Sequence, residues 1–257
     1  AGRESSDKFH HLSIVKFAKR KKSYTFDTQL KYLRADTTYP GGLTEEQYGN
    51  NPFQSGNWQN FKNRIAQGML QWRYKLAKKN IFSIKSQVRQ ERLDCHSKVY
   101  PTTYQRYSLF SLAPSLENQI TLFGKKAIST VGVYYSQQKF SNSAIIKDST
   151  RKKVSFTKSL KVDFLPNVRF FADAGLNFLE TKGDFNTGLQ GNEGKHLWSV
   201  SSSIDYRWSD FFSTAFYYQH HYQMPFIDQS NLMSGGYQAN FRLKPQFTDK
   251  YMLMMKY

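Results

Sequence analysis

The chain ends on a segment in which every second residue is apolar. Within Asp249–Tyr257, the residues Tyr251, Leu253, Met255 and Tyr257 fall on one face of a strand, because successive side chains of a β-strand point to opposite sides. This pattern predicts a final strand with one apolar face, closed by an aromatic residue. A soluble protein can also end on a buried strand, so the other strands have to show which solvent meets that face.

The same period of two recurs along the chain, and no segment shows a helical pattern of convincing length. In each of these segments, Phe, Tyr, Trp, Leu or Val alternate with Ser, Thr, Asn, Gln, Lys or Arg. The clearest segments are Tyr24–Tyr32, Leu70–Tyr74, Phe82–Arg89, Lys153–Phe164, Arg169–Phe178, Trp198–Trp208 and Met233–Lys244. We therefore predict an all-β chain of antiparallel strands, about twelve in number and at most about fourteen.

Short turns and long polar loops are expected to alternate between these strands. The expected turns are Lys19–Lys22, Ala77–Asn80, Gly124–Lys126, Leu165–Asn167, Ser209–Asp210 and Pro245–Asp249. The expected loops are Arg34–Asn60, Asp94–Thr103, Ser141–Thr150, Glu180–Lys195 and Gln223–Asn231. Alternating turns and loops are typical of an up-and-down membrane barrel.

The terminal strand resembles the C-terminal strand of Gram-negative outer-membrane β-barrel proteins, in which Phe is the usual last residue and Tyr a variant. The resemblance implies an antiparallel up-and-down transmembrane β-barrel, with residues 1–257 as a single domain in the cell outer membrane. It also implies that Tyr251, Leu253, Met255 and Tyr257 form the signal read by the barrel-assembly machinery. In this class both termini and the short turns are periplasmic.

One predicted turn conflicts with that topology. A turn at Pro245–Asp249 would place the short turns on the side opposite the C-terminus. Either the topology is unusual or a strand is miscounted. The segment Tyr104–Phe140 is the expected place of a miscount, with an extra turn at Ala113–Glu117.

Composition separates the membrane barrel from a soluble β-sandwich. Mean hydropathy is −0.66, and no run approaches the roughly 18 apolar residues of a spanning helix. Aromatic residues make up 16% of the chain, as the two interfacial girdles of a barrel require. Trp198 with Trp208 and Phe170 with Phe178 bracket their strands, which favours the barrel. Lys158 argues against it, because a lysine at mid-membrane costs about 2–4 kcal/mol unless a bulge or a protein contact removes it from lipid.

A net charge of +18 indicates an anionic partner. On the polar face of the predicted strands, basic residues would line the lumen and favour anions. These residues are Lys85, Arg89, Lys153, Lys161, Arg169, Arg207, Arg242 and Lys244. Alternatively, they pair with Asp27, Asp163, Asp173 and Asp205 and only fill the barrel.

No motif for catalysis or cofactor binding is present. The chain lacks a Gly-rich phosphate loop, a Gly-x-Ser-x-Gly elbow and an HExxH helix. The adjacent pairs His10–His11 and His220–His221 lack metal-site spacing, and the single Cys95 has no partner for a disulfide. We expect no enzyme activity, no cofactor and no metal.

The predicted function is an outer-membrane pore with a basic lumen that passes or exports anionic solutes or polymers. One alternative is a barrel scaffold, adhesion or export-system component that works through its long loops. Another is a soluble basic β protein that binds nucleic acid, which is disfavoured because basic and aromatic residues lie on opposite faces. Expected partners are outer-membrane lipid and lipopolysaccharide, the barrel-assembly machinery, an anionic solute or polymer, and a periplasmic or surface protein, but no nucleic acid.

Overall fold

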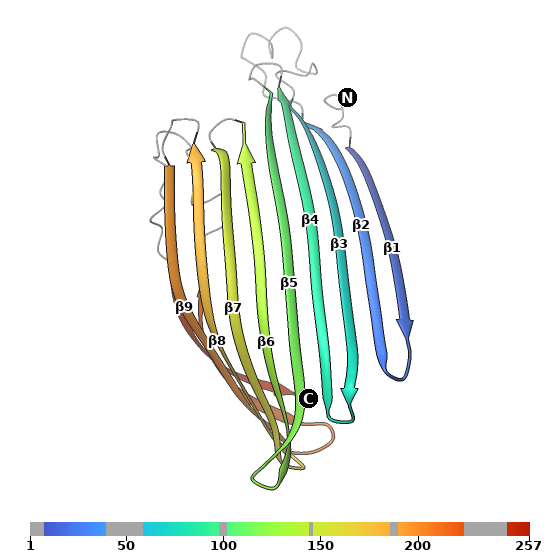
Figure 1. Cartoon of the computed structure of the whole chain (residues 1–257), viewed down its shortest axis with the longest axis vertical. Coiled ribbons are helices and arrows are strands. Elements are labelled where there is room, and N and C mark those ends of the chain that lie inside the picture. Colours follow the sequence, from blue (N-terminus) through green and yellow to red (C-terminus); the bar gives the residue numbers. More distant parts are fainter. Residues whose placement is uncertain (1–7, 40–58, 98–101, 144–145, 186–189, 224–245) are drawn as a thin grey trace.

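A computed structural model describes residues 8–39, 59–97, 102–143, 146–185, 190–223 and 246–257, all of them strands or their connections. The strands are β1 (Lys8–Arg20), β2 (Tyr24–Tyr39), β3 (Gln59–Ala77), β4 (Asn80–Ser97), β5 (Thr103–Leu122), β6 (Lys125–Asn142), β7 (Ile146–Leu165), β8 (Val168–Phe185), β9 (Gln190–Arg207), β10 (Ser213–Gln223) and β11 (Gln246–Lys256). Each strand pairs antiparallel with its neighbour in sequence, in a single sheet of 11 strands (Figure 1). This confirms the all-β, up-and-down arrangement.

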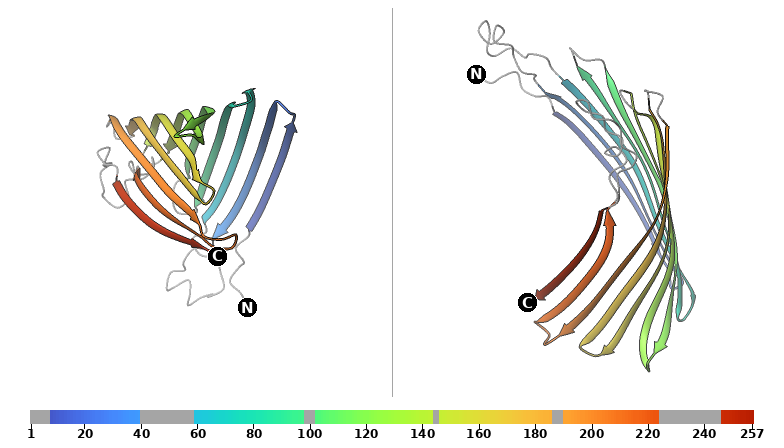
Figure 2. Two further views of the ribbon diagram at one scale, coloured as in Figure 1. Left: turned by 90° about the horizontal axis from the view of Figure 1, so that it is seen from below. Right: turned by 90° about the vertical axis from the view of Figure 1, so that its left-hand side faces the viewer.

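The sheet is strongly curved. Seen from below, it forms a gutter with β1 at one edge and β11 at the other (Figure 2). Within the described residues, β1 and β11 do not pair with each other. The sheet therefore has a convex face, which is turned toward the viewer in Figure 1, and a concave face behind it.

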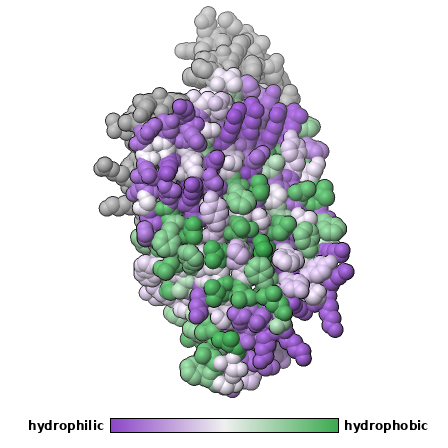
Figure 3. Space-filling model, viewed as in Figure 1, coloured by the Kyte–Doolittle hydropathy of each residue, from purple (hydrophilic) through white to green (hydrophobic). Residues whose placement is uncertain are grey.

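The convex face is apolar and exposed. Directly paired residues of antiparallel strands share a face, so the register assigns each side chain to one of the two. Large apolar side chains recur on the convex face, among them Leu30, Val88, Phe110, Phe156 and Leu176, which are 41–59% exposed. Hydrophobic residues form a band across the middle of this surface, with a hydrophilic region above it and residues of both kinds below it (Figure 3). Such a band is the lipid-facing surface expected of a membrane barrel.

The concave face is polar and crowded. Its buried residues include Ser111, Ser136, Ser155, Asn177 and Ser201, each at most 7% exposed. The Ser155 hydroxyl donates to the Asn177 side-chain oxygen at 2.7 Å, a cross-strand bond between β7 and β8. A polar interior and an apolar exterior are the reverse of a soluble β-sandwich.

A row of small residues crosses the concave face where the sheet bends. Ser115, Gly132, Thr157, Gly175 and Ser199 pair in succession from β5 to β9. A Cβ on Gly175 would lie 2.9 Å from Ser199 Oγ, so the neighbouring strand leaves no room for a side chain. Glycine at such places lets a curved sheet bring its inner side chains together.

Several segments predicted as loops belong to strands. The predicted loop Glu180–Lys195 is largely wrong, because β8 continues to Phe185 and β9 begins at Gln190. The predicted extra turn at Ala113–Glu117 is also wrong, because β5 runs through it. The polar segment Glu180–Lys195 lies beyond the apolar band, where both faces of a strand are polar and the period-two signal disappears. Ala113–Glu117 instead lies within β5, between the exposed Leu112 and Ile120.

The other long connections are corrected in the same direction. β2 and β3 take up both ends of the predicted loop Arg34–Asn60, and β4 takes up part of Asp94–Thr103, so Cys95 and its neighbour His96 lie in a strand. β6 and β7 likewise cover most of Ser141–Thr150. Strands that extend past the lipid band explain all of these differences.

The topology conflict is resolved by the last strand. The predicted turn at Pro245–Asp249 is wrong, because Gln246–Asp249 are the first residues of β11, where Asp249 pairs with His220. Ser213, which follows the β9–β10 turn, pairs with Lys256. The end of β11 therefore lies on the short-turn side, as the barrel class requires. The predicted strand Met233–Lys244 and most of the predicted loop Gln223–Asn231 lie outside the described residues.

Candidate anion pathway on the concave face

The register places six of the predicted lumen residues on one face. Arg89 aligns through β5 and β6 with Arg151, on the same face of β7 as Lys153 and Lys161. Asp163 on that face of β7 pairs with Arg169 on β8, and Arg169 pairs with Asp205 on β9, two residues before Arg207. The six residues are Lys85, Arg89, Lys153, Lys161, Arg169 and Arg207. Arg242 and Lys244 lie outside the described residues.

Two of these six basic residues are neutralised by carboxylates. Arg89 Nη2 lies 2.7 Å from Glu91 Oε2, two positions along β4. Arg169 Nε lies 2.8 Å from Asp163 Oδ1, across the β7–β8 hairpin. Asp173 instead accepts a hydrogen bond from the Ser201 hydroxyl. The alternative prediction, in which these basic residues pair with carboxylates inside the barrel, therefore holds for Arg89 and Arg169.

The other four keep an uncompensated charge. Among the described residues, no carboxylate oxygen lies within 4.0 Å of the terminal nitrogens of Lys85, Lys153, Lys161 or Arg207. Lys85 and Arg207 are exposed, whereas Lys153 and Lys161 are half-buried. These four charges are distributed along the strands β4, β7 and β9 on the concave face.

Lys153 is one of the residues that line a small cavity. Its Nζ is 5.7 Å from the ring of Tyr134 on β6 and 5.4 Å from the ring of Tyr222 on β10. This contact between β7 and β10 is made on the inner side of the curve, on the concave face. The cavity, of about 240 Å³, is also lined by Asp173, Asn177 and other polar side chains.

Two cavity residues were not anticipated from sequence. The Tyr222 hydroxyl and His221 Nδ1 are buried and have no hydrogen-bond partner among the described residues. His221 and Tyr222 follow His220, the last residue of β10 that pairs with β9. The apolar–polar pattern gave no sign of their role, because it breaks at this point.

The residues of the terminal strand are placed as predicted. Leu253 pairs with Phe216, and Tyr251 pairs with Tyr218. Tyr251, Leu253 and Met255 are 62–68% exposed on the convex face, and Tyr257 is fully exposed. Their recognition by an assembly machinery stays a prediction.

In the part of the chain that the structure describes, no helix is long and apolar enough to cross a membrane.

Comparison with solved structures identifies the fold. The ferric citrate transporter FecA superposes with a TM-score of 0.77 at 15% identity, over 99% of this chain and 42% of that one. The alcaligin receptor FauA from Bordetella pertussis gives 0.69 at 12% identity, over 97% and 40%. The ferric-catecholate import receptor Fiu from K12 E. coli gives 0.72 at 9% identity, over 99% and 49%. The chain spans less than half the length of these three structures.

The fold and its apolar exterior are those of a Gram-negative outer-membrane β-barrel protein. More particularly, its strands match part of the barrel of outer-membrane transport proteins. No protein-family model matches the chain, and no curated protein matches it. The solved neighbours named here are transporters and receptors.

Proposed function

We propose that this chain forms part of an outer-membrane transport barrel, and that its concave face is a pathway or binding surface for anionic solutes. The single observation that carries the proposal is the set of four uncompensated cations on that face: Lys85, Lys153, Lys161 and Arg207. A barrel interior that only needed filling would pair these charges or omit them. Cations held against low-dielectric walls attract anions and set the selectivity of a pore.

The structural neighbours support a solute of a particular kind. FecA is named as a transporter of ferric citrate and Fiu as an import receptor for ferric catecholate. We propose an anionic metal chelate of this type as the first solute to test. An anionic polymer is the second candidate, and a scaffold that moves no solute is the remaining alternative.

The test exploits the two faces of β7. Lys153 and Lys161 point into the concave side, whereas Lys152 and Lys158 point to the convex side of the same strand. The variant K153Q/K161Q therefore removes two inward charges, and K152Q/K158Q removes two outward charges as a matched control. Both variants have the same change in net charge.

Two measurements are made on the protein extracted from outer membranes. In planar bilayers under a salt gradient, the reversal potential should move toward cation preference in K153Q/K161Q and stay unchanged in K152Q/K158Q. In equilibrium binding, affinity for ferric citrate should fall about tenfold in the inward variant only, as expected for two lost charge contacts. Equal behaviour of the two variants in both assays would contradict the anion pathway.

The absence of any current in the planar bilayer would distinguish a receptor from an open pore. If the protein conducts no current but binds ferric citrate through Lys153 and Lys161, it acts as a gated receptor rather than an open pore. If it neither conducts nor binds an anion, the scaffold alternative stands and the proposed function is wrong.

A further inference from the structure

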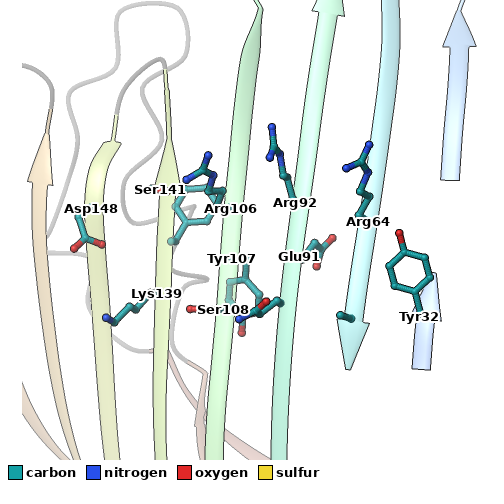
Figure 4. A pocket seen from close by; sticks show the side chains of 13 residues that line it. Tyr32, Arg64, Glu91, Arg92, Arg106, Tyr107, Ser108, Lys139, Ser141 and Asp148 are labelled. Atoms are coloured by element: carbon teal, nitrogen blue, oxygen red, sulfur yellow. The ribbon is translucent and has the colours of Figure 1, made fainter. Parts of the chain in front are cut away.

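Four arginines stand in one row on the convex face. Arg34 pairs with Arg64, Arg64 with Arg92, and Arg92 with Arg106, across β2, β3, β4 and β5. Adjacent strands are about 4.8 Å apart, so the row places four guanidinium groups within about 15 Å. We call these four residues the arginine row. Arg64, Arg92 and Arg106 are seen side by side at one level in Figure 4.

Such a row is costly unless something compensates it. Like charges directly opposite each other on neighbouring strands destabilise a sheet. Two members have carboxylate partners: Arg34 Nη2 lies 2.6 Å from Asp36 Oδ2, and Arg92 Nε lies 2.8 Å from Asp94 Oδ1. For Arg64 and Arg106, no carboxylate lies within 4.0 Å among the described residues. These two guanidinium groups are exposed and have donors to spare.

The surroundings of the arginine row form an open groove. A cavity of about 460 Å³ is lined by Arg64, Arg92, Arg106 and Lys139. Tyr32 and Ser141 add hydroxyl groups to its lining (Figure 4). Two acidic residues also line it: Asp148, and Glu91, whose carboxylate is paired with Arg89 on the concave face. The balance of the lining is positive, and its donors suit a multiply charged anion.

The height of the row identifies where that anion would be. On the turn side, the next convex position of β2 is Tyr32, and the one after it is Leu30, in the exposed apolar band. At about 3.3 Å per residue, the row lies about 13 Å beyond the first apolar side chains. Aromatic residues mark the membrane–water interface of barrels, so the arginine row lies at headgroup level. It is at the end opposite the short turns, which is the outer leaflet in this class.

We propose that the arginine row binds the phosphate groups of a phosphorylated glycolipid of the outer leaflet, such as lipopolysaccharide. Arginine presents a planar fork of donors that engages phosphate bidentately, and two guanidinium groups on neighbouring strands can share one phosphate. The acyl chains of the same lipid would lie against the apolar band directly below. A single ligand thus accounts for both the charge row and its position. This site is separate from the concave face and does not depend on the proposed transport.

The variant that tests the site is R64Q/R106Q. It removes the two arginines without carboxylate partners and leaves the Arg34–Asp36 and Arg92–Asp94 pairs in place. The matched control is K78Q/K125Q, which removes two exposed lysines at the short-turn end. A second variant, R64K/R106K, keeps the charge but removes the bidentate geometry.

Binding is measured on protein extracted from outer membranes, by native mass spectrometry and by titration with defined lipopolysaccharide. We expect R64Q/R106Q to bind at least tenfold more weakly than the unchanged protein, R64K/R106K to fall between them, and K78Q/K125Q to be unaffected. Dephosphorylated lipopolysaccharide should bind at least tenfold more weakly to the unchanged protein. Retained heat-modifiable migration on a gel shows that each variant is folded.

Three results would overturn the proposal. The first is equal lipid binding by folded R64Q/R106Q and the unchanged protein. The second is equal binding of phosphorylated and dephosphorylated lipid. The third is competition by inorganic phosphate at the concentration of the lipid itself, which would show a site for a free anion.

Discussion

Lys158 is the residue that fits its surroundings least well. It lies on the convex face between Val131 on β6 and Ala174 on β8, in an unbroken stretch of both ladders. The bulge that could have removed it from the apolar face is absent, since the irregularities of β7 are near its two ends. Its own strand presents Phe156 and Leu160 on either side of it. Lys158 therefore faces the hydrophobic band itself.

Replacing Lys158 with leucine should stabilise the protein. A lysine near the middle of the lipid-facing band costs about 2–4 kcal/mol, and K158L should recover that much of the free energy of unfolding. The matched control is K152L, on the same face of β7 but at the loop end, where the cost of a lysine is about 0–1 kcal/mol. Urea-induced unfolding in lipid vesicles measures the free energy of unfolding of both variants. If K158L gains no more than K152L, then Lys158 is covered by a partner rather than by lipid.

At the scale of the element, β11 is, like β1, a strand with one unpaired edge in the described residues. Its convex face carries Tyr251, Leu253 and Met255, which pair with convex residues of β10. Asp249 accepts hydrogen bonds from the Tyr218 hydroxyl at 3.0 Å and from His220 Nδ1 at 2.9 Å, which ties the start of the strand to β10. The far end of β11, with Tyr257, is exposed and available for recognition.

If Tyr257 belongs to the assembly signal, its loss should affect insertion more than stability. We expect Y257S to reduce the amount of folded protein in outer membranes several-fold, while refolding yield in detergent changes little. K256S is the matched control, because Lys256 is the adjacent residue on the opposite face. Membrane fractionation with a heat-modifiability gel measures insertion. Equal insertion of Y257S and K256S would show that Tyr257 only extends the strand.

At the scale of the whole molecule, the two ends of the sheet are unlike. The short turns Lys21–Ser23, Lys78–Lys79 and Phe123–Gly124 lie together at one end (Figure 1). The connections β2–β3, β4–β5, β6–β7, β8–β9 and β10–β11, most of whose residues lie outside the described part, leave from the other end. Because the end of β11 lies with the short turns, we propose that this end faces the periplasm, as the topology of the barrel class predicts.

This orientation predicts which side of the protein a membrane-impermeant reagent can reach. In a C95S background, K147C at the loop end should be labelled by an impermeant maleimide on intact cells. K79C, in the β3–β4 turn, should be labelled only after the outer membrane is permeabilised. Both positions are exposed, so burial does not explain a difference. The reverse result would invert the orientation and move the arginine row to the inner leaflet.

The alternation of apolar and polar residues at every second position predicted much of this fold from sequence. It identified segments of β2, β3, β4, β7, β8, β9 and β11 and the sorting of their residues between two faces, because β pleating and a lipid-facing surface both depend on local sequence. It also located most of the short turns, although the turns predicted at Pro245–Asp249 and Ala113–Glu117 are wrong. The terminal strand and the inward placement of Lys85, Lys153 and Lys161 followed from the same rule.

The tertiary structure alone decided the lengths of the strands and the neighbours across them. Beyond the lipid band both faces are polar, so no sequence period reveals that β8 and β9 continue toward the loops. The approach of Tyr222 to Lys153 depends on curvature across four strands, from β7 to β10. The arginine row depends on register, because Arg34, Arg64, Arg92 and Arg106 are far apart in sequence and become neighbours only when the hairpins align. Register is set by the pairing of whole strands, and no single segment contains it.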